Sequence, residues 1–392
     1  MIDYERLMSS SVRSLKPSGI RRFFDILENM HDPSAISLGI GEPDFVTPWH
    51  IREAGIYSLE QGFTKYTGNA GLKALRAETS NYLKRRFDLS YDPDGEIFIT
   101  VGGSEAIDLC VRALVEAGDE VIVPVPSFVC YGPLVSMSSG TPVYVETKAE
   151  NEFRLTAREL REAITPRTKL LILPFPNNPT GAVMERKDLL AIEEVLRGTD
   201  IMILSDEIYS ELSYGIHHTS PANIDGLKER TLVVNGFSKA FAMTGWRLGY
   251  VCGPKPLLRQ MVKIHQYGIM SAPTTSQYAA IEALKNGDDD IEMMRESYDR
   301  RRKLMLKRLR DMGLECFEPK GAFYMFPSIK STGMTSDEFC TRFLEEEKVA
   351  VIPGTAFGQG GEGFVRMCYA ASVENIEAAM DRMKRFLERV RK

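Results

Sequence analysis

The strongest constraint on the fold is a series of seven short apolar segments, rich in β-branched residues, between residues 97 and 251. Helical stretches separate several of them, at 104–116, 156–164 and 185–197. Apolar strands that alternate with helices indicate a mainly parallel sheet, covered by helices on both faces. The predicted strands are Ile97–Val101, Val121–Val125, Pro142–Val145, Leu170–Pro174, Ile201–Leu204, Leu232–Val234 and Leu248–Val251.

The pattern changes to an α+β arrangement after about residue 285. A charged helix is predicted over Ile291–Met312, and a later helix begins at the cap formed by Thr335 and Glu338. A final helix carries an apolar stripe from Ile376 to Val390. Three short strands are predicted in the same region, at Ala322–Phe326, Ala350–Ile352 and Phe364–Cys368.

These patterns predict two domains and a terminal arm. The large α/β domain covers residues 46–285, and a smaller α+β domain combines residues 14–45 with 286–392. An amphipathic helix predicted over 18–30 belongs to the smaller domain, and residues 1–13 form an N-terminal arm. The cleft between two such domains is a usual place for a small-molecule site.

Charge and cysteine usage exclude several classes of function. The 392 residues include 49 basic and 54 acidic side chains, a net charge of -5, so a nucleic-acid partner is not expected. No apolar run approaches the ~18 residues of a membrane span, and the first residues lack the apolar stretch of a signal peptide. The six cysteines form no C-x-x-C pair and have no histidine cluster beside them, so no metal site is expected. We therefore expect a cytoplasmic protein.

Residues with chemical potential follow several of the predicted strands. In an open parallel sheet, ligands bind beyond the carboxyl ends of the strands. The free N–H groups of a glycine-rich helix start suit a phosphate there. Each feature alone also has a purely structural explanation. The glycine-rich segment can be only a turn, Phe128 a core aromatic residue, Asp206 a helix cap and Lys239 a solvated surface lysine. The residues that follow the strands include Gly103, Ser104, Glu105, Phe128, Asn178, Asp206 and Lys239.

Taken together, these segments resemble one family. The segment from Gly236 to Gly249, which contains Ser238-Lys239 and Arg247, resembles the lysine-attachment signature of the class I aminotransferases, which are fold-type I pyridoxal phosphate enzymes. The resemblance covers nearly the whole chain. Its closest match is to bacterial aminotransferase A and to aspartate- and aromatic-type aminotransferases. The other matching segments, in the family's order, are Ser37–Asp44, Tyr66-Thr67, Asn178–Gly181, Asp206–Tyr209 and Phe364–Arg366.

The resemblance implies a cofactor and a role for each catalytic residue. Pyridoxal 5'-phosphate would be held as an imine by Lys239, whose freed amine would later carry a proton. Asp206 would face the pyridine nitrogen, and Asn178 and Tyr209 would bind the 3-oxygen of the ring. Phe128 would stack on the ring face.

The phosphate group would be bound from two subunits. The resemblance implies that Tyr66 reaches it from the neighbouring chain, so the active unit would be a homodimer with shared active sites. Within one chain, the phosphate ligands would be the N–H groups of Gly103, Ser104 and Glu105, together with Ser238 and Arg247.

The substrate would be an amino acid and then a 2-oxo acid. Arg366 would bind the α-carboxylate as a planar pair, with Gly41, Asn178 and Ile20 beside it. The implied reaction is a ping-pong transfer to a 2-oxo acid, 2-oxoglutarate above all. The candidate donors are N-acetyl-diaminopimelate, aromatic amino acids and aspartate. The segment His265–Thr274 has no arginine for a second carboxylate, which argues against strict aspartate preference.

Two positions depart from the pattern that is common in this family, and two alternative functions stay open. Gly236 stands where many members have a phosphate-binding serine, and Phe128 stands where tryptophan or tyrosine is common. A carbon–sulfur β-lyase of the same fold is one alternative, although those relatives usually carry histidine at the position of Tyr209. The other is an effector-sensing domain of a transcription regulator, which would need a DNA-binding domain ahead of it.

Overall fold

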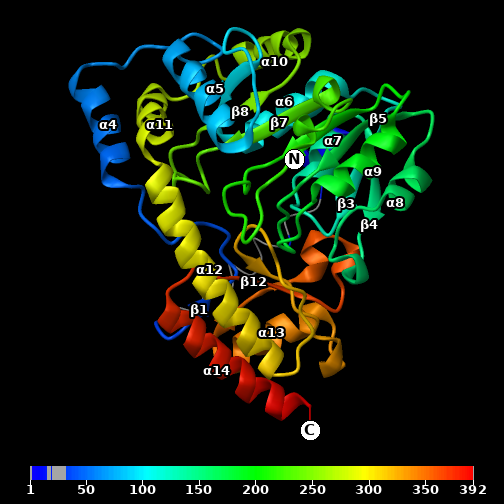
Figure 1. The fold of residues 1–392 in the computed structure, drawn as a ribbon. Coiled ribbons are helices and arrows are strands. Elements are labelled where there is room, and N and C mark those ends of the chain that lie inside the picture. Colours follow the sequence, from blue (N-terminus) through cyan, green and yellow to red (C-terminus); the bar gives the residue numbers. More distant parts are fainter. Residues whose placement is uncertain (1, 16–18, 20–31, 392) are drawn as a thin grey trace.

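The computed structural model describes residues 2–15, Gly19 and 32–391. Its largest element is a seven-stranded sheet in the order β2-β8-β7-β6-β5-β3-β4, which lies in the upper half of Figure 1. All neighbouring strands are parallel except for the two pairings of β8. The predicted mainly parallel sheet is thus confirmed. The strands are β2 Ile97–Thr100, β3 Glu120–Val125, β4 Thr141–Glu146, β5 Thr168–Leu173, β6 Met202–Asp206, β7 Thr231–Gly236 and β8 Gly249–Cys252.

Helices cover both faces of this sheet. Successive side chains of a strand point to opposite faces, so Phe98 packs in one core cluster while Ile97 and Ile99 pack in another. On the Phe98 side lie α6 Gly102–Leu114, α7 Tyr131–Met137 and α10 Lys255–Gly268. The opposite side is covered by α4 Trp49–Glu60, α5 Lys73–Phe87, α8 Ala157–Ala163, α9 Arg186–Leu196 and α11 Thr274–Asn286.

The C-terminal part forms a second unit below the sheet in Figure 1. The antiparallel sheet β11-β12-β9 and the parallel pair β1-β10 share one hydrophobic core with three helices. The buried stripe of the last helix includes Ile376, Met380 and Met383, as predicted. The elements are β1 Ile36–Ser37, β9 Tyr324–Met325, β10 Val349–Ala350, β11 Ile352–Pro353, β12 Val365–Cys368, α12 Asp288–Asp311, α13 Ser336–Glu347 and α14 Val373–Val390.

Two local predictions can be compared with this structure. The helix cap predicted at Thr335 and Glu338 is confirmed, because Thr335 accepts a hydrogen bond from the Glu338 N–H, and Thr156 and Glu159 form a reciprocal capping box at the start of α8. The single strand predicted at Ala350–Ile352 is wrong. The chain instead changes partner there, since β10 pairs with β1 and β11 pairs with β12. The domain boundaries stay a prediction.

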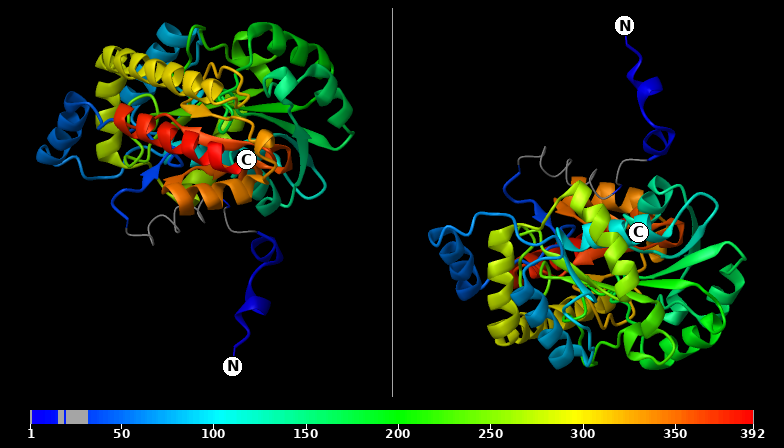
Figure 2. Two further views of the ribbon diagram at one scale, coloured as in Figure 1. Left: turned by 90° about the horizontal axis from the view of Figure 1, so that it is seen from below. Right: turned by 90° about the horizontal axis from the view of Figure 1, so that it is seen from above.

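The N-terminal residues are described only in part. The short helices α1 Tyr4–Leu7 and α2 Ser10–Arg13 precede the gap, and Figure 2 shows α1 projecting away from the rest of the molecule. The helix predicted over 18–30, and Ile20 with it, lies outside the described residues. Within the described ranges, no helix has the length and apolar character needed to cross a bilayer.

Candidate active site

One cavity of about 430 Å³ is lined both by the carboxyl edge of the large sheet and by the C-terminal unit. Most residues predicted for the site line it, although they come from segments that are far apart in the sequence. Tyr131 and Tyr324 line it as well. The predicted residues found there are Gly41, Gly103, Ser104, Phe128, Asn178, Asp206, Tyr209, Ser238, Lys239, Arg247 and Arg366.

The Lys239 side chain lines this cavity and carries its amine. Its Nζ donates a hydrogen bond to the Gly41 carbonyl oxygen at 2.7 Å and lies 5.8 Å from the centre of the Tyr209 ring. Burial lowers the pKa of this amine to about 8, and the positive charges of Arg366 and Arg247 act in the same direction. A substantial neutral fraction therefore exists near neutral pH, and only the neutral amine is a nucleophile or a base.

Asp206 ends β6 with its carboxylate buried. Its Oδ2 accepts a hydrogen bond from the Tyr131 hydroxyl at 2.7 Å, and its Oδ1 accepts one from the Ile208 N–H at 3.3 Å. Burial raises the pKa of the Asp206 carboxyl, and these hydrogen bonds oppose the increase. A cationic N–H group in the cavity, such as a protonated pyridine, would favour the ionised carboxylate further.

A buried arginine lies on the side of the C-terminal unit. Arg366, in β12, is only 2% exposed, donates from Nη1 to the Asn178 Oδ1 at 2.9 Å and donates from Nη2 to the Gly39 carbonyl. Its Nε is buried and has no partner among the described residues. A guanidinium has five N–H donors, so Arg366 retains capacity for a carboxylate. The Tyr324 ring lies 4.7 Å from this guanidinium.

The first turn of α6 has the charge and the free N–H groups that suit an anion. Gly102 has a φ of +75°, and a Cβ there would lie 2.7 Å from Nη2 of Arg247, so the guanidinium lies directly against this turn. The first N–H groups of a helix have no partner within it and favour anions. The Glu105 side chain turns back to accept from the Val101 N–H and from His265, so only its main chain is available to a ligand.

The same region explains why glycine stands at position 236. Gly236 and Gly249 face each other in β7 and β8, and a Cβ on Gly236 would lie 2.9 Å from the Gly249 Cα. A Cβ on Gly249 would in turn lie 2.7 Å from the Gly103 nitrogen. Side chains are excluded at both positions by close backbone packing, which leaves Ser238 as the serine of the Gly236–Gly249 segment that lines the cavity.

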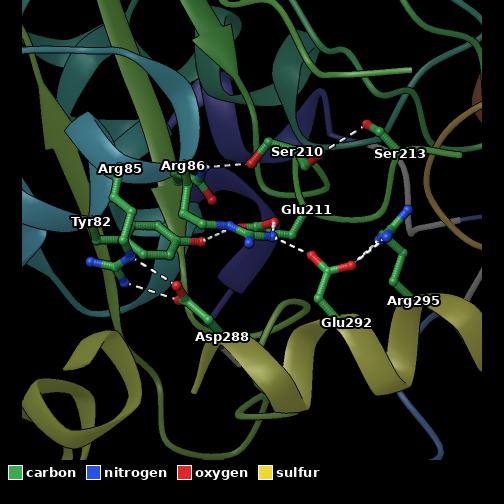
Figure 3. A network of polar contacts seen from close by, with 10 residues as sticks. Tyr82, Arg85, Arg86, Ser210, Glu211, Ser213, Asp288, Glu292 and Arg295 are labelled. Atoms are coloured by element: carbon green, nitrogen blue, oxygen red, sulfur yellow. Dashed lines mark hydrogen bonds and ion pairs between the residues drawn. The ribbon is translucent and has the colours of Figure 1, made fainter. Parts of the chain in front are cut away.

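A polar network holds the turn that carries Tyr209 (Figure 3). The buried Glu211 carboxylate accepts hydrogen bonds from the Tyr82 hydroxyl and from Arg86, whose Nη2 also lies 2.8 Å from Glu292 Oε1. Tyr82 and Arg86 belong to α5 and Glu292 to α12. The turn after β6 is thus fixed to helices of both units, which restricts where the Tyr209 side chain can lie.

Tyr66 differs from the other predicted site residues. Its side chain is 80% exposed and does not line the cavity of its own chain. The loop around it is fixed by hydrogen bonds from Gln277 to the Thr67 hydroxyl and from Asn69 to the Met270 carbonyl. Tyr66 is therefore presented on the surface by an ordered loop.

Comparison with known proteins identifies the family. The family model described as aminotransferase class I and II matches residues 33–383. The chain belongs to this family. It is 48% identical to an aspartate aminotransferase of Pyrococcus abyssi, over 97% of this chain and 98% of that one. It is 45% identical to aromatic-amino-acid aminotransferase 2 of Thermococcus litoralis, over 97% of this chain and 98% of that one. The solved structure of Thermus thermophilus aspartate aminotransferase with maleate is 40% identical, has a TM-score of 0.92, and aligns over 96% of this chain and 99% of that one.

The chain is accordingly an aminotransferase with the fold-type I architecture predicted from its sequence. Two tyrosines that line the cavity of this aminotransferase, Tyr131 and Tyr324, were not predicted as site residues. Tyr131 lies three residues after Phe128 at the start of α7, so its position beyond a strand end was a usable signal. Tyr324 lies in a two-residue strand of the C-terminal unit, where no local pattern points to the cavity.

Proposed function

We propose that this aminotransferase binds pyridoxal 5'-phosphate covalently through Lys239 and transfers an amino group from an L-amino acid to a 2-oxo acid, with 2-oxoglutarate as the principal acceptor. The observation that carries this proposal is the shared cavity, which combines a buried amine of lowered pKa, a buried carboxylate and an anion site. Both the charge and the position of these groups suit one ligand with a phosphate, a ring nitrogen and a carbonyl carbon.

The lining residues fit each part of this cofactor. Asp206 suits the ring nitrogen, Asn178 and Tyr209 suit the 3-oxygen, and Phe128 offers its ring face. When bound, pyridoxal phosphate supplies an electron sink and a temporary carrier for the amino group. The residues proposed for the phosphate are Gly103, Ser104, Glu105, Ser238 and Arg247, with Tyr66 of a second chain.

Lys239 and Arg366 then carry out the steps that the protein itself contributes. Arg366 binds the α-carboxylate of the substrate and so places its α-carbon near Lys239. The neutral Nζ of Lys239 takes the proton from that carbon and returns a proton on the same face of the cavity. When this amine is free, it donates a hydrogen bond to the Gly41 carbonyl oxygen at 2.7 Å.

Donor and acceptor occupy the same place in turn, which makes the mechanism ping-pong. Among the described residues that line the cavity, the cationic side chains are Lys239, Arg247 and Arg366, and each already has a proposed partner. A buried side-chain carboxylate without a charge partner costs several kcal/mol. We therefore infer a tolerant donor site that accepts N-acetyl-diaminopimelate and aromatic amino acids as well as aspartate.

The active unit is a homodimer in this proposal. Exposed apolar side chains gather on α4, on the loop that follows it and at the end of α10, where Tyr267 is 91% exposed. An apolar surface of this kind marks an interaction site. A second copy that covers it would bring Tyr66 to the neighbouring cavity. The exposed residues of this surface are Trp49, Ile56, Tyr57, Leu59, Phe63, Tyr66, Tyr267, Ile269 and Met270.

A donor panel tests the proposed reaction. The protein loaded with pyridoxal phosphate is incubated with 2-oxoglutarate and with each donor, and the 2-oxo acid and glutamate are both measured. We expect the two products in equal amounts. Ammonia released from a donor without any 2-oxoglutarate would instead support the β-lyase alternative.

The same panel tests donor tolerance. We expect an aromatic or long amidated donor to reach a kcat/KM comparable with that of aspartate. If aspartate exceeds every such donor by more than about a hundredfold, which is ~2.7 kcal/mol, a second carboxylate site exists and the inference of tolerance is wrong.

A further inference from the structure

Tyr324 contacts three groups of the proposed site with one side chain. Its hydroxyl lies 2.7 Å from the Tyr209 hydroxyl, and its ring packs 4.7 Å from the Arg366 guanidinium. A Cβ on Gly41 would lie 2.5 Å from the Tyr324 hydroxyl, so the absence of a side chain at Gly41 makes room for it. Tyr324 is fully buried and comes from the C-terminal unit, whereas Tyr209 follows a strand of the large sheet.

The hydrogen bond between the two hydroxyls restricts the groups to which their protons can be donated. Each tyrosine hydroxyl has one proton to donate and can also accept. The hydroxyls of Tyr209 and Tyr324 have no other hydrogen-bond partner among the described residues, and either can be the donor. If Tyr209 donates its only proton to a ligand in the cavity, its oxygen can accept the proton of Tyr324. A donor that itself accepts a hydrogen bond is strengthened.

We propose that Tyr324 is a positioning residue of this aminotransferase, which acts through Tyr209. Tyr324 donates to the Tyr209 oxygen, and this directs the Tyr209 proton to the 3-oxygen of the cofactor and strengthens that hydrogen bond. The inference rests on the proposed function, because it requires pyridoxal phosphate in the cavity. The Tyr324 ring has a separate contact with Arg366, so a change that removes only the hydroxyl isolates the effect on Tyr209.

The test is Tyr324→Phe with Tyr214→Phe as the matched control. Tyr214 is also buried, but its hydroxyl donates to the Ala322 carbonyl at 2.7 Å and, among the described residues, forms no hydrogen bond with Tyr209. Cofactor-loaded proteins are titrated, and the pH midpoint of the visible absorption change is measured. Donation from Tyr209 favours the anionic 3-oxygen and therefore opposes protonation of the chromophore. The midpoint should rise by about 0.5 pH unit in Tyr324→Phe and by less than about 0.2 in the control.

A double-mutant cycle tests whether the effect passes through Tyr209. In a Tyr209→Phe background, adding Tyr324→Phe should produce no further shift, because the hydroxyl it would act on is absent. In the single variant, KM should stay within about twofold while kcat falls, since the ring still packs on Arg366.

The outcomes separate the two proposals. A wild-type protein with no visible absorption band refutes the proposed cofactor and this inference with it. A wild-type band whose midpoint is unchanged in Tyr324→Phe refutes the inference alone. Equal shifts in Tyr324→Phe and Tyr214→Phe, or additive shifts in the double variant, also overturn it.

Discussion

The protonation of Lys239 provides a quantitative test of the site before any cofactor is added. Burial and the charges of Arg247 and Arg366 lower the pKa of this amine from 10.5 to about 8. At about 1.4 kcal/mol per pKa unit, the folded protein disfavours the protonated form of Lys239, relative to the neutral form, by roughly 3 kcal/mol compared with an ordinary lysine. At pH 7.5, roughly one quarter of the Lys239 amine is neutral, compared with about one part in a thousand for an ordinary lysine.

The assay is acylation of the cofactor-free protein with a small amine reagent over a range of pH. Peptide mass mapping measures the labelling rate of the peptide that contains Lys239 at each pH. For each protein, these rates are divided by the plateau rate at high pH, so that differences in the access of the reagent to the amine cancel. The labelling midpoint should lie near pH 8. Arg366→Gln should raise it, since one positive charge is removed. Arg342→Gln, which removes an arginine paired with Glu346 on the surface, should not. A midpoint near 10.5 would refute the reasoning.

The same shift predicts the sign of a pH effect on stability. The folded protein binds the Lys239 proton more weakly than the unfolded chain does, so unfolding takes up a proton between pH 8 and 10.5. The free energy of unfolding of the cofactor-free wild type should therefore rise across this window relative to Lys239→Met. Below about pH 8 the buried ammonium lowers the free energy of unfolding by its full amount, and above about pH 10.5 this destabilisation is absent.

Lys239→Ala should still bind pyridoxal phosphate in a fluorescence titration, because the phosphate site and Arg247 remain. Its turnover should fall by orders of magnitude, and retained turnover would contradict the role of Lys239. Mixing Tyr66→Phe chains with Arg247→Ala chains should yield more activity than the average of the two parents, since one site of each mixed dimer is intact; activity at the average would exclude shared sites. Gly236→Ser should destabilise the protein by ~1–3 kcal/mol, because its Cβ would lie 2.9 Å from the Gly249 Cα; an unchanged melting temperature would show that the strands can separate there.

The sequence predicts the large sheet and the residues at its carboxyl edge for one physical reason. A strand buried on both faces must be a continuous apolar run, so each run, and therefore each strand end, is visible in the chain. Asp206 and Lys239 were found as the residues that follow such runs. Asn178 and Phe128 were found in the same way, and the cavity brings all four together.

The missed residues depend on contacts between distant segments. Tyr324 reaches the cavity because β9 pairs with β12, which places it beside Arg366. The sequence predicts a strand over Ala322–Phe326, but it does not reveal which strand pairs with it or in which register. The Glu211 network likewise joins α5, α12 and the turn after β6, and its charged members look like ordinary surface charges when each is considered alone.

The central claim is that Lys239 is the covalent attachment point of pyridoxal phosphate in this aminotransferase. The most direct measurement is borohydride reduction of the cofactor-loaded protein, which makes the bond between cofactor and lysine permanent, followed by proteolysis and peptide mass mapping. We expect a pyridoxyl group on the peptide that contains Lys239 and on no other lysine peptide. A pyridoxyl group on a different lysine, or on none, would contradict it.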